Sequence, residues 1–187
     1  MSSQFEAFKT RAEGVSAEVH RFAAREEALA FILEFLKSTG ISEDSECGAV
    51  WSDGSFLEGS AKADLQRQVP GLRFEATREV SAAAKVGISQ MDWAISGTGT
   101  LVQDATAVEK RLVSTLPPIH VAVLGTERIL EDMGAVLERL RPDQLNYISF
   151  ITGPSRTADI ERVLTIGVHG PARLIIVAVD EFDRVTA

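Results

Sequence analysis

The sequence predicts an α/β protein with an open, mainly parallel sheet that is covered by helices on both faces. Three runs in the C-terminal half, at 119–124, 147–151 and 174–179, are almost continuously apolar and rich in β-branched residues. Such runs are typical of strands buried on both faces of a parallel sheet. Helical patterns at 129–140 and 160–166 separate the three runs. This alternation of strand and helix indicates βαβ units.

The N-terminal half predicts helices first and then a short strand. Polar residues 2–13 predict a short helix, and residues 21–36 predict a longer amphipathic helix that is capped by Gly40. The apolar block 47–51 is followed by Ser-Asp-Gly, which indicates a strand leading into a turn. We expect a further short helix within 56–68.

The middle of the chain predicts short elements. Residues 72–74 suggest a strand, and the alanine-rich stretch 81–86 predicts a helix that stops at Gly87. Residues 93–102 predict two short extended pieces that are hinged at the glycines.

Length and composition predict a single domain over residues 1–187, with a helical N-terminal portion over about 1–40. Apolar residues make up 45% of the chain and charged residues 25%, as in ordinary globular proteins. The formal net charge of -8 argues against nucleic acid and anionic membranes as partners, because both select a basic surface. The sequence has no 18-residue apolar stretch and no signal-peptide pattern at its start, so we expect no membrane insertion and a cytoplasmic location.

Metal and cofactor motifs are not evident. Cys47 is the single cysteine, and we interpret it as a small core residue because a thiolate-held iron–sulfur cluster needs several. His20, His120 and His169 lie too far apart for the short spacing of a zinc motif. We therefore predict no metal and no resident cofactor in this chain.

Three unusual loops follow predicted strands, at 96–100, 125–128 and 152–159. Open parallel sheets bind ligands outside the carboxyl ends of their strands, so we expect these loops to face a ligand. The first loop is either a tight turn or one wall of a pocket, and it is not a dinucleotide fingerprint because the third glycine is missing. Its hydroxyls and amides make four residues candidates for ligand binding: Gly97, Thr98, Gly99 and Thr100.

The third loop is the most informative of the three. Gly153 allows a tight turn or a close approach by a ligand, and Pro154 fits the start of a helix. Ser155 and Thr157 are candidate helix caps, and Arg156 offers a planar fork to a carboxylate or phosphate. Together they predict an anion site at a helix start. The alternative is an ordinary capped helix with a surface arginine.

Two residues are candidates for acid–base chemistry. Asp159 falls in the first turn of the predicted helix, where a carboxylate is favoured by the helix dipole whether or not it also faces a pocket. His169 lies between two glycines, so it is either a general base or donor in a loop or a structural residue. His120 opens an apolar strand and is expected to be structural, and Arg111 is expected at the surface.

Taken in order, the motifs resemble the LUD-domain family, whose typical member is lactate-utilisation protein C. The resemblance covers about residues 85–180. It implies a fold like that of the NagB/RpiA/CoA-transferase superfamily. The motifs that carry it are Gly87–Ser89, Ala94–Thr100, Arg111–His120, Gly153–Glu161 and Gly167–Pro171.

The resemblance also implies a function. A member of this family is expected to take part in oxidising L-lactate to pyruvate together with iron–sulfur partner proteins. The sequence leaves the oligomeric state open, a homo-oligomer included. The family commonly has Ala-Glu-Thr-Gly-Thr where this chain has Ser96–Thr100, so the expected glutamate is replaced by Gly97. A covalent step through a carboxylate at that position is therefore excluded, and whether the subunit is catalytic stays open. The alternative is an independent enzyme or binding module for a carboxylated or phosphorylated metabolite.

Overall fold

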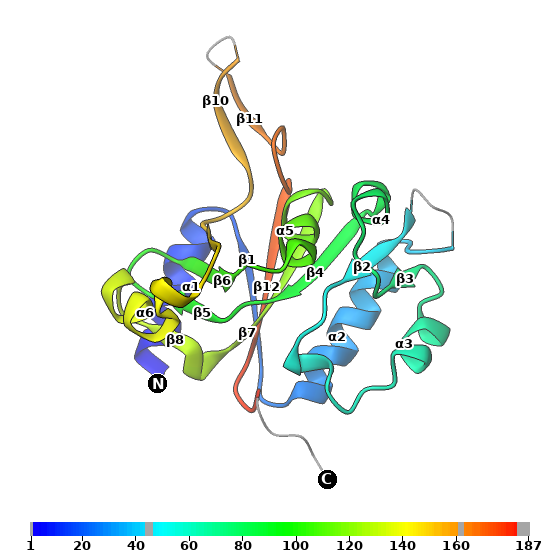
Figure 1. The fold of residues 1–187 in the computed structure, drawn as a ribbon, viewed down its shortest axis with the longest axis horizontal. Helices are drawn as coiled ribbons and strands as arrows, with labels where there is room; N and C mark the ends of the chain where they lie inside the picture. The colour runs from blue at the N-terminus through cyan, green and yellow to red at the C-terminus, as the bar shows by residue number, and fades with distance from the viewer. Residues whose placement is uncertain (1, 44–46, 161–162, 183–187) are drawn as a thin grey trace.

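The computed structural model describes residues 2–43, 47–160 and 163–182 (Figure 1). Its centre is a six-stranded sheet in the order β1-β12-β7-β4-β2-β3, in which every pair of neighbouring strands is parallel. The predicted fold class, an open parallel α/β sheet, is therefore confirmed. The strands are β1 (Glu18–Phe22), β2 (Ala49–Trp51), β3 (Leu72–Arg73), β4 (Val86–Gln90), β7 (Ile119–Gly125) and β12 (Arg173–Val179).

A second sheet and a hairpin complete the strand structure. The second sheet has the order β8-β5-β6-β9, and the hairpin consists of β10 and β11. Figure 1 shows the hairpin standing away from both sheets. The bounds are β5 (Trp93–Ile95), β6 (Thr100–Asp104), β8 (Ile129–Leu130), β9 (Ile148–Ile151), β10 (Arg156–Ile160) and β11 (Val163–Ile166).

Both faces of the central sheet are covered because its strands are apolar on both sides. Along β12, Ile175 and Val177 pack into a buried cluster with the apolar side of α2, whereas Leu174 and Ile176 pack with α1 and the second sheet. Each such buried side chain contributes about 2 kcal/mol of hydrophobic stabilisation. The helices are α1 (Ser2–Gly14), α2 (Arg25–Ser38), α3 (Lys62–Gln68), α4 (Arg78–Ala83), α5 (Val108–Thr115) and α6 (Met133–Leu140).

Two strands of the central sheet were not predicted. The stretch 21–36, expected as one helix, contains the end of β1 before α2 begins at Arg25. The expected helix at 81–86 ends at Ala83, and β4 follows at once. A β-carbon at Gly87 would lie 2.1 Å from the Val113 carbonyl oxygen, so this strand uses glycine to let α5 approach.

Three further expectations in the C-terminal half are wrong in detail. The helix predicted at 129–140 begins only at Met133, after β8. The strand at 147–151 is β9, an antiparallel edge strand of the second sheet. The helix predicted at 160–166 is the hairpin, in which Arg156 pairs with Ile166. The predicted helix contained Glu161, which lies outside the described residues. None of the described helices is long and apolar enough to cross a membrane.

Candidate functional site

The two C-terminal motifs lie side by side at the base of the hairpin. The Ser155 amide donates to the Pro171 carbonyl at 2.8 Å, and the Gly167 amide donates to the Ser155 carbonyl at 2.9 Å. A β-carbon at Gly170 would lie 3.2 Å from that of Ser155. Two segments separated by a hairpin are thus brought together by main-chain hydrogen bonds.

Glycines let the two hydroxyl-bearing loops pack against the end of α1. Gly99 and Gly153 have φ angles of +68° and +70°, in the left-handed region that favours glycine. A β-carbon at Gly99 would lie 2.4 Å from the Ala12 amide nitrogen, and one at Gly153 would lie 2.3 Å from the Val15 carbonyl oxygen. Both positions therefore require glycine for backbone conformation and for space.

A chain of three threonine hydroxyls joins the same loops. The hydroxyl of Thr100 lies 2.7 Å from that of Thr98 and 2.8 Å from that of Thr152. Thr100 is buried, whereas Thr98 and Thr152 are exposed. The hydroxyl chain thus runs between two surface positions through one buried group, a geometry in which each hydroxyl can donate and accept.

Arg156 extends the cluster towards the residues that precede β1. Its Nη2 donates to the Ser16 hydroxyl at 2.7 Å, and the side chain is exposed. A guanidinium has five N–H donors, and this hydrogen bond uses one of them. Pro154, beside it in the chain, is buried. Arg156 is thus placed to offer an anion the planar fork that the sequence suggested.

Of the remaining predicted site residues, some have described side chains and others do not. Gly97 and His169 are exposed in their loops. Thr157 and Asp159 belong to β10, and their side chains lie outside the described part of the chain. A β-carbon at Gly97 would lie 3.1 Å from the Glu131 carbonyl oxygen, and its φ is not in the left-handed region. The fold therefore leaves room, at a small cost, for the side chain that this position lacks.

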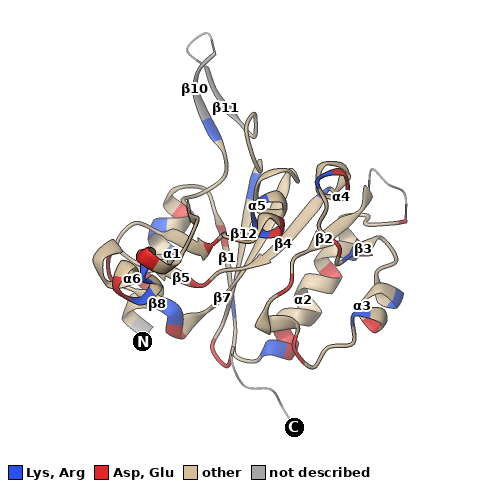
Figure 2. Cartoon of the chain, in the orientation of Figure 1, with Lys and Arg blue, Asp and Glu red and all other residues tan. Residues whose placement is uncertain are grey.

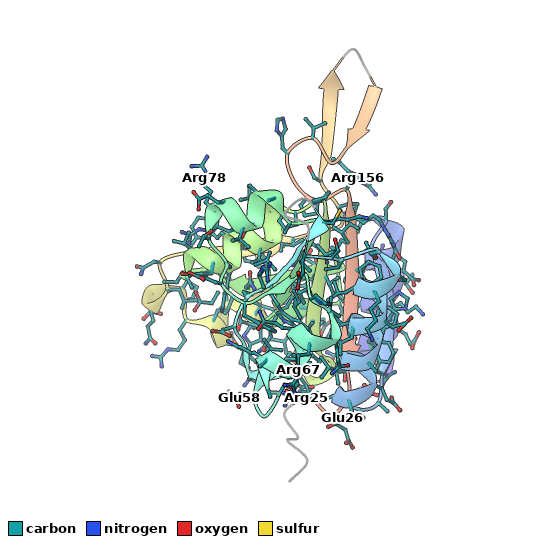
Figure 3. The ribbon with its side chains drawn as sticks, turned by 90° about the vertical axis from the view of Figure 1, so that its right-hand side faces the viewer. Arg25, Glu26, Glu58, Arg67, Arg78 and Arg156 are labelled. Atoms are coloured by element: carbon teal, nitrogen blue, oxygen red, sulfur yellow. The ribbon has the colours of Figure 1, made fainter. Side chains whose placement is uncertain are left out.

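The position of the cluster in the sheet differs from the prediction. The hairpin leads into β12 at its amino end, where the amides of Ala172 and Arg173 donate to the Pro118 carbonyl ahead of β7. The loop 125–128, by contrast, follows the carboxyl end of β7. Figure 3 shows Arg156 below the hairpin and Arg25 near Glu58 at the opposite end of the molecule. The motif cluster thus lies at the end of the main sheet where its parallel strands begin, which we call the amino edge; the end where they finish is the carboxyl edge. The prediction was wrong because β9 and β10 are not strands of that sheet.

A buried polar pair between β4 and β7 was not predicted as a pair. The Ser89 hydroxyl lies 2.8 Å from Nε2 of His120, and both residues are fully buried. Burial lowers the pKa of His120 to about 4. Its Nδ1 has no hydrogen-bond partner among the described residues. His120 is therefore a neutral structural residue near pH 7, as its place in an apolar strand indicated.

The carboxyl edge of the main sheet holds a second group whose pKa is shifted. The Asp92 carboxylate lies just after β4, 4.0 Å from the Lys110 ammonium, and accepts a 2.7 Å hydrogen bond from the Asp104 amide. Burial raises the pKa of Asp92 more than Lys110 and this hydrogen bond lower it. This group was not predicted, because no strand was expected at 86–90 to place Asp92 at this end of the sheet.

Acidic and basic residues are interspersed along the elements drawn in Figure 2. Among the described residues there is no group of three or more His, Cys, Asp or Glu side chains placed to hold a metal ion. The sites above are therefore small clusters of hydroxyls, single cations and single carboxylates.

The fold defines an α/β class that is found among solved structures. A DUF162 family protein from Deinococcus radiodurans superposes with a TM-score of 0.65 over 95% of this chain and 97% of its own, at 18% identity. The LUD domain family model matches residues 5–179. The chain belongs to the LUD domain family.

Curated relatives carry two kinds of name. "Lactate utilization protein C" of Exiguobacterium sp. is 37% identical over 57% of this chain, and that of Halalkalibacterium halodurans is 31% identical over 70%. The "Uncharacterized protein YkgG" of Escherichia coli is 28% identical over 78%. The matches cover 49%, 61% and 59% of these relatives, so the chain spans about half to three fifths of their length.

Proposed function

We propose that this chain takes part in lactate utilisation, as a cytoplasmic subunit or accessory factor in the oxidation of L-lactate to pyruvate. The observation that carries the proposal is the match to relatives named lactate utilization protein C, at 37% identity over 113 residues. Oxidation of lactate releases two electrons and two protons. In this proposal an iron–sulfur partner protein accepts the electrons.

The amino-edge cluster is the part of the chain that we propose to act in this role. Its exposed residues, with Arg156 and His169 as the groups that carry charge or a proton, would meet a small anionic metabolite or a partner surface. Gly97 leaves this cluster without the family's usual carboxylate, which favours binding over covalent chemistry here. The proposed ligand-binding residues are Gly97, Thr98, Gly99, Thr100, Gly153, Pro154, Ser155, Arg156 and Thr157, and the proposed acid–base residues are Asp159 and His169.

Growth on lactate tests the proposal. Deletion of the gene in a strain without a paralogue should abolish or slow growth on L-lactate as sole carbon source, and the wild-type chain should restore it. We expect Arg156→Ala to restore growth poorly. The matched control is Arg67→Ala, because the Arg67 side chain is 77% exposed and pairs only with its helix neighbour Asp64 among the described contacts. Unimpaired lactate growth of the deletion strain would remove the proposal's main support.

Co-purification tests the partner separately. A tagged chain expressed at native level should retain iron–sulfur proteins when the cells grow on lactate. Loss of that association in Arg156→Ala, with retention in Arg67→Ala, would place the contact at the amino edge.

A further inference from the structure

A hollow of about 360 Å³ lies at the edge of the sheet opposite the motif cluster. Such a volume falls in the range of small-molecule sites, about 300–1,000 Å³. Residues from three separate segments line it: Ser52 and Asp53 after β2, Phe74 after β3, and Ala107, Glu109 and Lys110 at the start of α5. None of the family motifs contributes to it.

The topology of the main sheet singles out this place. From β2 the chain moves outward through α3 to β3. From the neighbouring β4 it moves the other way, through β5, β6 and α5, to β7. Leu65 of α3 packs into the cluster on one face of the sheet, and Val113 of α5 packs with Val50 on the other. The crevice outside the carboxyl ends of two strands whose connections diverge is where open α/β sheets bind ligands.

The lining combines one cation with two carboxylates. Lys110 lies 4.0 Å from the half-buried Asp92 carboxylate, at the outer limit of an ion pair, so a second anion can share its ammonium. Asp53 is paired with Lys62, and Glu109 is a carboxylate in the first turn of α5. A ligand that fits this set offers an anionic group to the lysine and a hydrogen-bond donor to a carboxylate.

The rest of the wall is apolar. The half-buried ring of Phe74 and the methyl group of Ala76 face the hollow, and the Lys62 ammonium lies 5.3 Å from the centre of the Phe74 ring. Phe74 also lines a second hollow of about 620 Å³. A ligand with an apolar body therefore has a surface to lie on.

We propose that this hollow binds a small hydroxy acid, with its carboxylate on Lys110, its hydroxyl donating to Asp53 or Glu109, and its carbon skeleton against Phe74. The pairing of an anionic group with a hydrogen-bond donor follows from the lining. The choice of L-lactate as the first member to test rests on the proposed function. An amino acid offers the same pairing of carboxylate and donor, so the experiment includes one.

Titration of the full-length wild-type chain, followed by amide chemical shifts, tests the proposal without any substitution. The probes are L-lactate, L-3-phenyllactate, L-alanine and propionate, which lacks the donor. We expect saturable shifts at residues 52–53, 74–76 and 107–110, tightest with phenyllactate and at least tenfold weaker with propionate than with lactate. Tighter binding of L-alanine than of L-lactate would change the class to amino acids and overturn the hydroxy-acid assignment.

Substitutions then separate the two edges of the sheet. Lys110→Met should weaken acid binding at least tenfold, Lys110→Arg should keep part of it, and the matched Lys9→Met on α1 should keep all of it. Far-ultraviolet circular dichroism and a thermal melt show whether each variant is folded. Shifts confined to the base of the hairpin, with none at residues 52–53, 74–76 and 107–110, would overturn the proposal, as would the lack of any shift at millimolar acid. Growth on lactate without acid binding would refute only this inference, whereas acid binding without a growth phenotype would refute only the proposed function.

Discussion

The two edges of the central sheet are built in different ways. At the amino edge, Gly99, Gly153 and three threonines hold two loops against α1 by close backbone contact and short hydrogen bonds. At the carboxyl edge, residues from three segments surround a hollow, and the cation among them, Lys110, is only loosely paired with Asp92. Close packing makes the first edge intolerant of added atoms, and the second has room for them. Sequence motifs that gather at one end of a sheet can therefore reflect packing requirements as well as ligand binding.

The largest expected effect concerns the packing at the amino edge. Gly153→Ala should lower the free energy of unfolding by about 4 kcal/mol, since the methyl group needs a left-handed backbone and meets the Val15 carbonyl oxygen. Urea unfolding followed by circular dichroism measures this. Gly97→Ala, in the neighbouring loop, is the matched control and should cost less than about 1 kcal/mol, because only a 3.1 Å contact must relax there. Equal costs for the two variants would mean that packing does not explain the glycines of this edge.

Much of the sheet could be predicted because its central strands are uniformly apolar. The runs that became β7 and β12 have an apolar residue at nearly every position, and such a pattern allows few other structures. β4 was not predicted because its sequence, Val-Gly-Ile-Ser-Gln, mixes small and polar residues and follows a short alanine-rich helix. β1 was not predicted because its sequence, Glu-Val-His-Arg-Phe, is mostly polar and ends only a few residues before α2, so its last residues were assigned to that helix.

The candidate site was predictable only in part, because sequence patterns are local and the arrangement of distant segments is not. The motifs at 153–157 and 167–171 were found as a pair, and main-chain hydrogen bonds join them. Their end of the sheet was wrong because the run 147–151, expected as a strand of the main sheet, is β9 of the second sheet, and a short apolar run does not show which sheet it joins. The hollow around Lys110 left no local pattern, since its lining comes from positions up to 58 residues apart in the chain, 52 to 110. Only the tertiary fold brings such residues together.

The next largest expected effect is on the pH dependence of stability, and it concerns His120 in β7. Its pKa is about 4 in the folded chain against 6.5 in the unfolded one, so the unfolded state takes up the proton first as the pH falls. The contribution to stability is therefore complete above pH 6.5 and is lost towards pH 4, by about 3 kcal/mol. Urea unfolding at pH 7 and at pH 4 measures it. His120→Gln should show a correspondingly smaller loss between the two pH values, and His169→Gln, at an exposed loop, should behave like the wild type. A wild-type pH dependence in His120→Gln would show that other groups govern the acid response.

The smallest effect separates hydrogen bonding from packing at the amino edge. Thr100→Val keeps the shape of the side chain and removes the central hydroxyl of the Thr98–Thr100–Thr152 chain. Thr98 and Thr152 are exposed, so water can replace the lost partner, and the loss of stability should be only about 1 kcal/mol. Thermal unfolding of this variant beside Thr98→Val, which removes a terminal exposed hydroxyl and should cost less, gives the comparison. If Thr100→Val keeps full stability but fails to restore growth on lactate, the hydroxyl chain acts in function and the glycines alone hold the edge together. If it restores growth fully, the hydroxyls serve the fold, and the functional role of this edge is left to Arg156 and His169.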